Sequence, residues 1–165
     1  MSVVAERIFR DTFAAGNDAD EIDRYCAGAF SADIQAREIA EPNALTLLVE
    51  AQDELVAFAQ LAFDSPNHAA GAQRPATHLQ RLYVDREWHG TGLARDIMDT
   101  VVGRAVESGA GELWLAVWER NDRAIAFYRK VGFTVAGEQS FQLGNELQRD
   151  LVMVRSLRPG QPPDG

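Results

Sequence analysis

The segment 88–95 holds the residues of this sequence that could most directly do chemistry. It reads Trp-His-Gly-Thr-Gly-Leu-Ala-Arg, and it joins a strand-like run over 78–84 to a helical pattern over 93–106. Gly90 and Gly92 leave this junction without side chains, so backbone N–H groups can face an anion at the start of a helix, where the dipole favours negative charge. The junction predicts a phosphate-binding turn, although glycines between a strand and a helix are also common as plain turn residues.

Two familiar nucleotide-binding motifs do not fit these glycines. The dinucleotide fingerprint needs G-x-G-x-x-G and an acidic residue about 20 positions later, and the P-loop needs G-K-S/T. The only lysine of the chain is Lys130, which is far from the glycines in sequence. The phosphate is therefore expected to belong to another kind of ligand.

The composition indicates one globular domain. The chain has 165 residues, of which 46% are hydrophobic, enough to bury a core. No apolar run reaches the ~20 residues of a membrane span, and residues 1–10 lack the apolar stretch of a signal peptide. Cys26 is the only cysteine, as is typical of a reducing cytoplasm, and we expect it to be buried beside Tyr25 and Phe30. The three histidines are scattered, so we expect no metal site.

The net charge of −9 comes entirely from the N-terminal part of the chain. Residues 1–64 hold 13 acidic and 4 basic side chains, whereas residues 65–165 hold 12 of each. Without a basic excess, nucleic-acid binding is not expected. The acidic part permits a cationic small-molecule partner, but it can equally be a solvated helix face.

Hydrophobic periodicity predicts the elements that would position the junction. Helices are expected over 3–14, from Asp18 or Asp20 to 27, and over 31–41, 93–106 and 122–130; strands are expected over 45–51, 54–63, 78–85, 112–119, 133–143 and 147–157. The strand over 112–119 has apolar residues on both faces, which is typical of a sheet covered by helices on both sides. We expect a single α/β domain over 1–158 with a mixed sheet and a disordered tail over 159–165, and the glycine junction at the middle of the sheet, where such sheets bind ligands.

Two motifs in this chain occur together in a known superfamily. The first is Leu79-Gln80-Arg81-Leu82-Tyr83-Val84 followed by His-Gly-Thr-Gly-Leu-Ala over 89–94, which is similar to a strand followed by Q/R-x-x-G-x-G/A. The second is Asn-Asp-Arg-Ala-Ile-Ala-Phe-Tyr-Arg-Lys-Val-Gly-Phe over 121–133, which is similar to N-x-x-A-x-x-F-Y-x-x-x-G-F. In this order the chain resembles the GNAT superfamily of acetyl-CoA-dependent N-acetyltransferases over residues 17–157. Segments 141–144 and 150–153 look most like bacterial spermidine/spermine-type members.

The resemblance implies the GNAT fold, with a twisted and mostly antiparallel central sheet, and acetyl-CoA as cosubstrate. It implies that the strand backbone pairs with the pantetheine arm and could polarise the thioester carbonyl, through Leu82, Tyr83 and Val84. It implies that the turn and the first helical residues hold the pyrophosphate, namely His89, Gly90, Thr91, Gly92, Leu93, Ala94 and Arg95. Further contacts to the arm would come from Asn121, Arg123, Ala124 and Phe127. Tyr128 would protonate the leaving thiolate as general acid, although an aromatic residue at this helical position can also be core.

The group that deprotonates the acceptor stays open. An alkylamine with a pKa of about 10 is almost all ammonium at pH 7, so it must first lose a proton. Many polyamine-type members have a glutamate where this chain has Gln80, which cannot accept a proton. His78, on the same strand face by parity, and Glu119 are the other candidates for a base or a water relay. Each of them can also be an ordinary strand residue.

Two departures from the superfamily pattern are visible. His89 replaces the usual Gln or Arg of the signature. Members normally begin with a short strand before the first helix, whereas this chain begins almost directly with the helix, so that strand is absent or the start of the chain is incomplete. An absent edge strand would expose its neighbour and favour self-association, and a homodimer is common in the superfamily.

The sequence therefore predicts a cytoplasmic N-acetyltransferase for the primary amine of a small, cationic, polyamine-like acceptor, with no nucleic-acid or membrane partner. Candidates for an acidic wall of the acceptor site are Asp18, Asp20, Glu21 and Asp23, with Tyr25 and Phe30 as apolar lining. One alternative is acetylation of a protein N-terminus or lysine. Another is a non-catalytic acyl-CoA-binding regulatory module.

Overall fold

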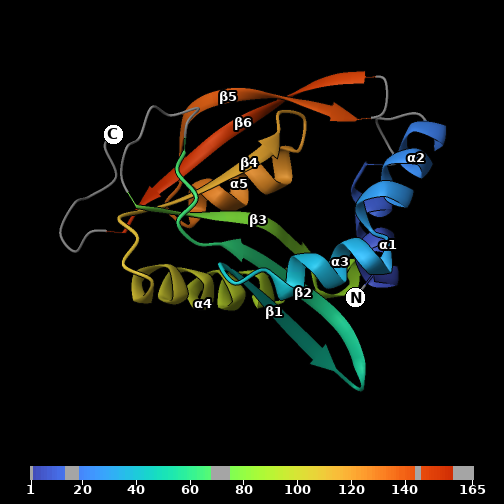
Figure 1. Cartoon of the computed structure of the whole chain (residues 1–165), viewed down its shortest axis with the longest axis horizontal. Helices are drawn as coiled ribbons and strands as arrows, with labels where there is room; N and C mark the ends of the chain where they lie inside the picture. Colours follow the sequence, from blue (N-terminus) through green and yellow to red (C-terminus); the bar gives the residue numbers. More distant parts are fainter. Residues whose placement is uncertain (1, 14–18, 68–74, 144–145, 158–165) are drawn as a thin grey trace.

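The computed structural model describes residues 2–13, 19–67, 75–143 and 146–157 (Figure 1). Its helices are α1 (Ser2–Phe13), α2 (Ala19–Ala29), α3 (Ala32–Ala40), α4 (Leu93–Glu107) and α5 (Asp122–Lys130), with a short 3-10 helix η1 (Arg86–Trp88). Its strands are β1 (Ala44–Ala51), β2 (Glu54–Ala62), β3 (Ala76–Val84), β4 (Glu112–Trp118), β5 (Thr134–Leu143) and β6 (Glu146–Ser156). The predicted helices and strands are confirmed, with ends that differ by at most two residues. η1 was not predicted, and the tail over 159–165 lies outside the described residues.

Local side chains explain where several helices begin and end. The Ser31 hydroxyl accepts a hydrogen bond from the N–H of Ile34 at 3.3 Å and caps α3. The Asn121 side chain accepts one from the N–H of Ala124 at 3.2 Å and caps α5. Gly132, with a φ of 92°, ends α5 in the left-handed conformation that glycine adopts at low cost.

The six strands form one sheet in the order β1-β2-β3-β4-β6-β5. All neighbouring strands are antiparallel except β3 and β4, which are parallel, so the predicted mixed and mostly antiparallel sheet is confirmed. Gln52 and Asp53 form the tight turn between β1 and β2, both with positive φ. β1 lies at one edge of the sheet, and a homodimer through this edge stays a prediction.

Helices cover both faces of the sheet (Figure 1). On one face, α4 and α5 pack on β2, β3, β4 and β6 through a large apolar core that contains Met98, Val101, Leu113 and Met153. On the other face, α1 and α2 pack on the sheet through a smaller cluster that joins Phe9, Ile22, Cys26 and Phe30 to Phe58 of β2, with Tyr25 beside it. Cys26 is 1% exposed, so its predicted burial next to Tyr25 and Phe30 is confirmed. Among the described residues, no helix is long and apolar enough to cross a membrane.

β3 and β4 diverge, and this divergence positions the site. They pair only where Ala76, Thr77 and His78 face residues 112–114. β3 continues to Val84 while pairing with β2 alone, and β4 continues to Trp118 while pairing with β6 alone. Beyond His78 on β3 and Trp114 on β4, the edges that these two strands turn toward each other pair with no strand. The unpaired part of β3 leads toward the glycine junction. A bulge opposite Gln60 and Leu61 adds Gln80 to β3 and interrupts the side-chain alternation there.

Candidate active site

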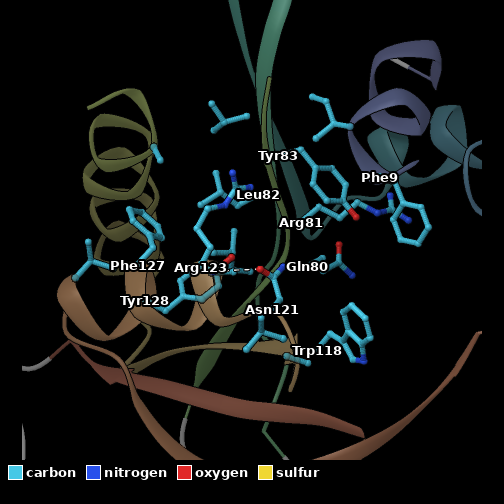
Figure 2. Close-up of a pocket in the computed structure, with 18 of the residues that line it drawn as sticks. Phe9, Gln80, Arg81, Leu82, Tyr83, Trp118, Asn121, Arg123, Phe127 and Tyr128 are labelled. Atoms are coloured by element: carbon cyan, nitrogen blue, oxygen red, sulfur yellow. Dashed lines mark hydrogen bonds between the residues drawn. The ribbon is translucent and has the colours of Figure 1, made fainter. Parts of the chain in front are cut away.

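A cavity of about 620 Å³ lies along the diverging strands and is lined from both faces of the sheet. Figure 2 shows Phe127 and Tyr128 of α5 on one side and Phe9 and Tyr83 on the other, with Asn121 between them. The cavity thus connects the helical layer of α4 and α5 with the layer of α1 and α2. A passage of this kind lets two reactants meet from opposite faces of the sheet.

The glycine junction forms one end of this cavity. Gly90 and Gly92 line it with φ values of 79° and 98°, a left-handed backbone that other residues adopt only with strain. Gly92 is also the N-cap of α4 and supplies no capping side chain, while the Thr91 hydroxyl before it accepts from the Leu93 N–H at 3.4 Å. The first-turn N–H groups and the dipole of α4 can act on an anion in the cavity. Arg95 in the first turn of α4 and Arg123 beside His89 supply positive charge at this end, and Lys130 also lines the cavity.

His89 is bonded through both of its ring nitrogens. Nε2 lies 2.9 Å from the carbonyl oxygen of Val84, and Nδ1 lies 2.5 Å from Nη1 of Arg123. A carbonyl can only accept and a guanidinium can only donate, so this network assigns the proton to Nε2 and the lone pair to Nδ1. His89 therefore fixes Arg123 at the junction, and it occupies the Val84 carbonyl that the resemblance assigns to the pantetheine arm.

Most residues implied by the resemblance meet at this cavity. The lining includes Leu82, Tyr83, Val84, His89, Gly90, Gly92, Ala94, Arg95, Asn121, Arg123, Ala124, Phe127 and Tyr128. Thr91 and Leu93 are outside the lining. The Thr91 hydroxyl donates to the Trp88 carbonyl at 2.8 Å, and Leu93 packs against the core under α4.

Tyr128 presents a protonated phenol to the cavity. Its side chain is held edge-on against Phe127 and Phe133, with ring centroids 5.5 and 5.7 Å away. The residue is 9% exposed, and burial raises the pKa of its phenol above the usual value because the phenolate would be poorly solvated. The phenol therefore keeps its proton at neutral pH, as a proton donor must.

The three candidate bases lie in different settings. His78 lines the cavity, stacks on Trp114 with ring centroids 3.7 Å apart, and has its pKa lowered to about 4 by burial. Gln80 also lines the cavity and is exposed. Glu119 is outside the lining, and its Oε2 accepts from Nε of Arg149 at 2.8 Å. His78 is thus neutral at pH 7 but a weak base, and Glu119 is occupied by an ion pair.

The acidic residues of the N-terminal helices do not line the cavity in the part of the chain that the structure describes. Asp18 and the side chain of Glu21 lie outside the described residues. Asp20 and Asp23 are exposed, and Asp23 forms an ion pair with Arg10. Of the apolar candidates, Tyr25 lines the cavity, whereas Phe30 is buried in the cluster behind it. The expected acidic wall of α2 is therefore not brought to the site by Asp20 or Asp23.

Asp150 is the cavity residue that the sequence reasoning missed. It lies on β6 opposite Trp118 of β4, it is 8% exposed, and burial raises its pKa to about 6. Among the described lining residues it is the one carboxylate. One feature of the sequence could have indicated its burial. Asp150, Val152 and Val154 alternate along the strand and so share one sheet face, and these valines pack inward.

Comparisons with known proteins agree with this geometry. A family model for the acetyltransferase (GNAT) family matches residues 6–133. An uncharacterized N-acetyltransferase of Mycobacterium tuberculosis is 43% identical over 79 residues, 48% of this chain and 51% of that protein. The spermine/spermidine N(1)-acetyltransferase of Bacillus subtilis is 25% identical over 107 residues, 64% of this chain and 66% of that protein. The chain spans about half the length of the mycobacterial relatives that it matches.

Solved structures share the fold. The PaiA N-acetyltransferase from Thermoplasma acidophilum, solved in complex with coenzyme A, superposes with a TM-score of 0.75 at 20% identity, covering 94% of this chain and 89% of that one. The family model extends over well more than half of the sequence and includes the glycine junction and the segment of Tyr128. The resemblance seen in the sequence is thereby confirmed: the chain belongs to the acetyltransferase (GNAT) family.

Proposed function

We propose that this protein transfers an acetyl group from acetyl-CoA to the primary amine of a small cationic acceptor. The observation that carries the proposal is the cavity along β3 and β4, because it joins an anion-binding turn to a buried phenol and then to a buried carboxylate. Each of these three parts has a separate task in acetyl transfer to an amine.

The residues at the α4 and α5 side fit acetyl-CoA. The glycine junction with Arg95, Arg123 and Lys130 would hold the phosphates through backbone N–H groups and positive charge. The free edge of β3 at Leu82 and Tyr83 would pair with the amides of the pantetheine arm, as an added strand does. Asn121, Ala124 and Phe127 would line the rest of the arm.

When bound, acetyl-CoA supplies an activated acetyl thioester. The amine nitrogen forms the new bond to the acetyl carbon, and the carbon–sulfur bond breaks. Tyr128 holds a proton at its phenol oxygen and gives it to the leaving sulfur, which avoids release of a free thiolate. The backbone N–H groups of the β3 edge would stabilise negative charge on the acetyl oxygen.

The charge of the chain and the name of one relative indicate the acceptor class. The net charge of −9 favours a cationic acceptor, and the Bacillus subtilis relative is named for spermine and spermidine. A polyamine-like amine is therefore the first class to test. Protein N-termini or lysines are the second class, to be tested with short basic peptides.

The proposal is tested by following free thiol release from acetyl-CoA with spermidine, spermine, arylalkylamines, amino acids, aminoglycosides and short basic peptides. Tyr128→Phe should lower kcat by about 100-fold to 10,000-fold and leave the affinity for acetyl-CoA nearly unchanged. Thermal melting with and without acetyl-CoA controls for folding and cosubstrate binding. If acetyl-CoA raises the melting temperature but no acceptor is acetylated, the protein is a CoA-binding module and the proposal is wrong.

A further inference from the structure

We propose that Asp150 and the aromatic side chains beside it form the acceptor subsite, and that this subsite takes an amine with a single ammonium group next to a flat apolar group, such as an arylalkylamine. Asp150 binds the ammonium and accepts its proton. This inference rests on the proposed acetyl transfer and names the chemical class of its acceptor.

The first argument is the setting of Asp150. Its side chain is nine-tenths buried and lines the cavity, and no side chain or backbone group among the described residues forms a hydrogen bond or ion pair with it. Its neighbours in register, Trp118 of β4 and Gln139 of β5, leave the carboxylate without a cation. A buried and unpaired carboxylate is costly to maintain, and a bound ammonium would offset that cost.

The second argument is the side of the sheet on which Asp150 lies. It shares a face with Val152, which packs on Ala76 and Trp114 away from α4. Tyr128 lies in the opposite layer, in the core under α4 and α5. Figure 2 shows Trp118, the register partner of Asp150, across the pocket from Tyr128. An amine bound by Asp150 would thus approach from the face opposite the anion-binding turn, which leaves the thioester between the two.

The third argument is the aromatic lining around this end of the cavity. Phe9 stacks on Tyr25 with ring centroids 4.7 Å apart, and Tyr25 meets Phe141 edge-on at 5.6 Å. These three rings and Trp118 all line the cavity. Ring faces attract a cation, and their apolar area favours a flat apolar substituent over a hydrated chain.

The fourth argument concerns a second ammonium group, which a polyamine would bring. The charged neighbour on this face is Arg81, a cation whose guanidinium donates to Glu38 and, at 2.6 Å, to the side-chain oxygen of Gln60. With Asp150 as the one carboxylate of the described lining, a second ammonium would find no carboxylate partner there and would face the positive charge of Arg81. A monoamine avoids that repulsion.

The proton balance also involves the groups that share this face. Tyr25 of α2 and Tyr83 of β3 have their pKa values raised by burial and stay neutral, and His78 has a pKa of about 4. Arg81 stays charged. The pKa of Asp150, about 6, makes it a stronger base than an ordinary aspartate while it is still ionised at pH 7. The ammonium proton moves to the Asp150 carboxylate and leaves through the open cavity, and the freed nitrogen lone pair attacks the acetyl carbon. The second proton, which the nitrogen loses as the amide forms, restores the Tyr128 phenol that has protonated the leaving sulfur.

The experiment compares 2-phenylethylamine with spermidine as acceptors for the wild type, Asp150→Asn and a control variant. Asp99→Asn makes the same change at an exposed position of α4 outside the cavity lining. We expect the wild type to have at least about a tenfold higher kcat/KM for 2-phenylethylamine, with an acid limb near pH 6. Asp150→Asn should lose about 100-fold or more of this kcat/KM, and the acid limb should disappear, while acetyl-CoA still raises the melting temperature.

Asp150→Glu keeps a carboxylate and should retain the acid limb with part of the activity, which separates loss of the base from loss of structure. A preference for spermidine, or an Asp150→Asn profile like that of Asp99→Asn, overturns the subsite. If the wild type acetylates neither amine, acetyl transfer to small amines fails, and calorimetry with 2-phenylethylamine on the CoA-saturated protein decides the subsite by itself. Binding by the wild type that Asp150→Asn abolishes supports it, and absence of binding overturns it.

Discussion

The Nδ1 atom of His89 lies 2.5 Å from Nη1 of Arg123, so the residue directly before Gly90 holds a cation of α5 in place. The other ring nitrogen donates to the end of β3. One imidazole therefore links the strand, the turn and the helix that together form the glycine-junction end of the cavity.

Replacing His89 should weaken cosubstrate binding more than chemistry. His89→Ala leaves Arg123 without its partner, and we expect the KM for acetyl-CoA to rise about fivefold to tenfold with a small change in kcat. His89→Gln can donate to Val84 and accept from Arg123, so it should restore most of the affinity. Steady-state kinetics with acetyl-CoA as the varied substrate provides the measurement. Equal KM values for the two variants would show that the link does not position Arg123.

Because of its backbone conformation, replacing Gly92 by alanine should change the free energy of unfolding in the opposite direction from the same replacement at an ordinary helical glycine. Gly92→Ala forces a residue with a Cβ to a φ of 98°, and we expect it to lower the free energy of unfolding by about 1–2 kcal/mol. Gly103→Ala in the same helix meets no atom within 4 Å and should stabilise by about 0.5–1 kcal/mol. Urea denaturation of both variants measures the contrast. Similar effects of the same sign would argue against the strained junction.

The ionised side chain of Asp150 should lower the free energy of unfolding at neutral pH. Its pKa of about 6 in the folded protein exceeds the ~3.9 of an unfolded aspartate. The folded state therefore holds the proton more tightly, and the free energy of unfolding falls as the pH rises from about 4 to about 6. Asp150→Asn removes this penalty and should stabilise by about 1–2 kcal/mol at pH 7.5, a value reduced because the carboxylate faces an open cavity. The difference should shrink at pH 4, where the folded state is protonated and the unfolded state is about half protonated. Denaturation curves at the two pH values check it, and a less stable variant at pH 7.5 would contradict it.

Loss of the Tyr128 proton should not lower kcat at alkaline pH. Burial raises its pKa above the usual value near 10, so the phenol stays protonated throughout the neutral and mildly alkaline range. We expect kcat at saturating acceptor to show no basic limb up to about pH 10. A fall of kcat below pH 9 that Tyr128→Phe removes would indicate a phenol with a lower pKa than this burial allows.

Sequence patterns determined the parts of this protein that depend on residues close together in the chain. Ser31, Asn121 and Gly132 cap helices through contacts three or four residues away, and Gly90 and Gly92 define the turn because their positive φ is a local property. The strands and helices follow from hydrophobic alternation in the same way, and the family follows from two contiguous motifs.

Tertiary structure alone decided which distant side chains meet. Asp150 faces the cavity because β6 pairs with β4, some 30 positions earlier in the chain, and no local pattern states that pairing. The bonds of His89 to Arg123 and of Glu119 to Arg149 likewise join different elements. The exposed acidic residues of α2 were the more prominent signal in the sequence, yet burial and an unpaired position single out one aspartate on a late strand. Local conformation is set by neighbours in the chain, whereas the charge of a site is set by the packing of elements that the chain keeps far apart.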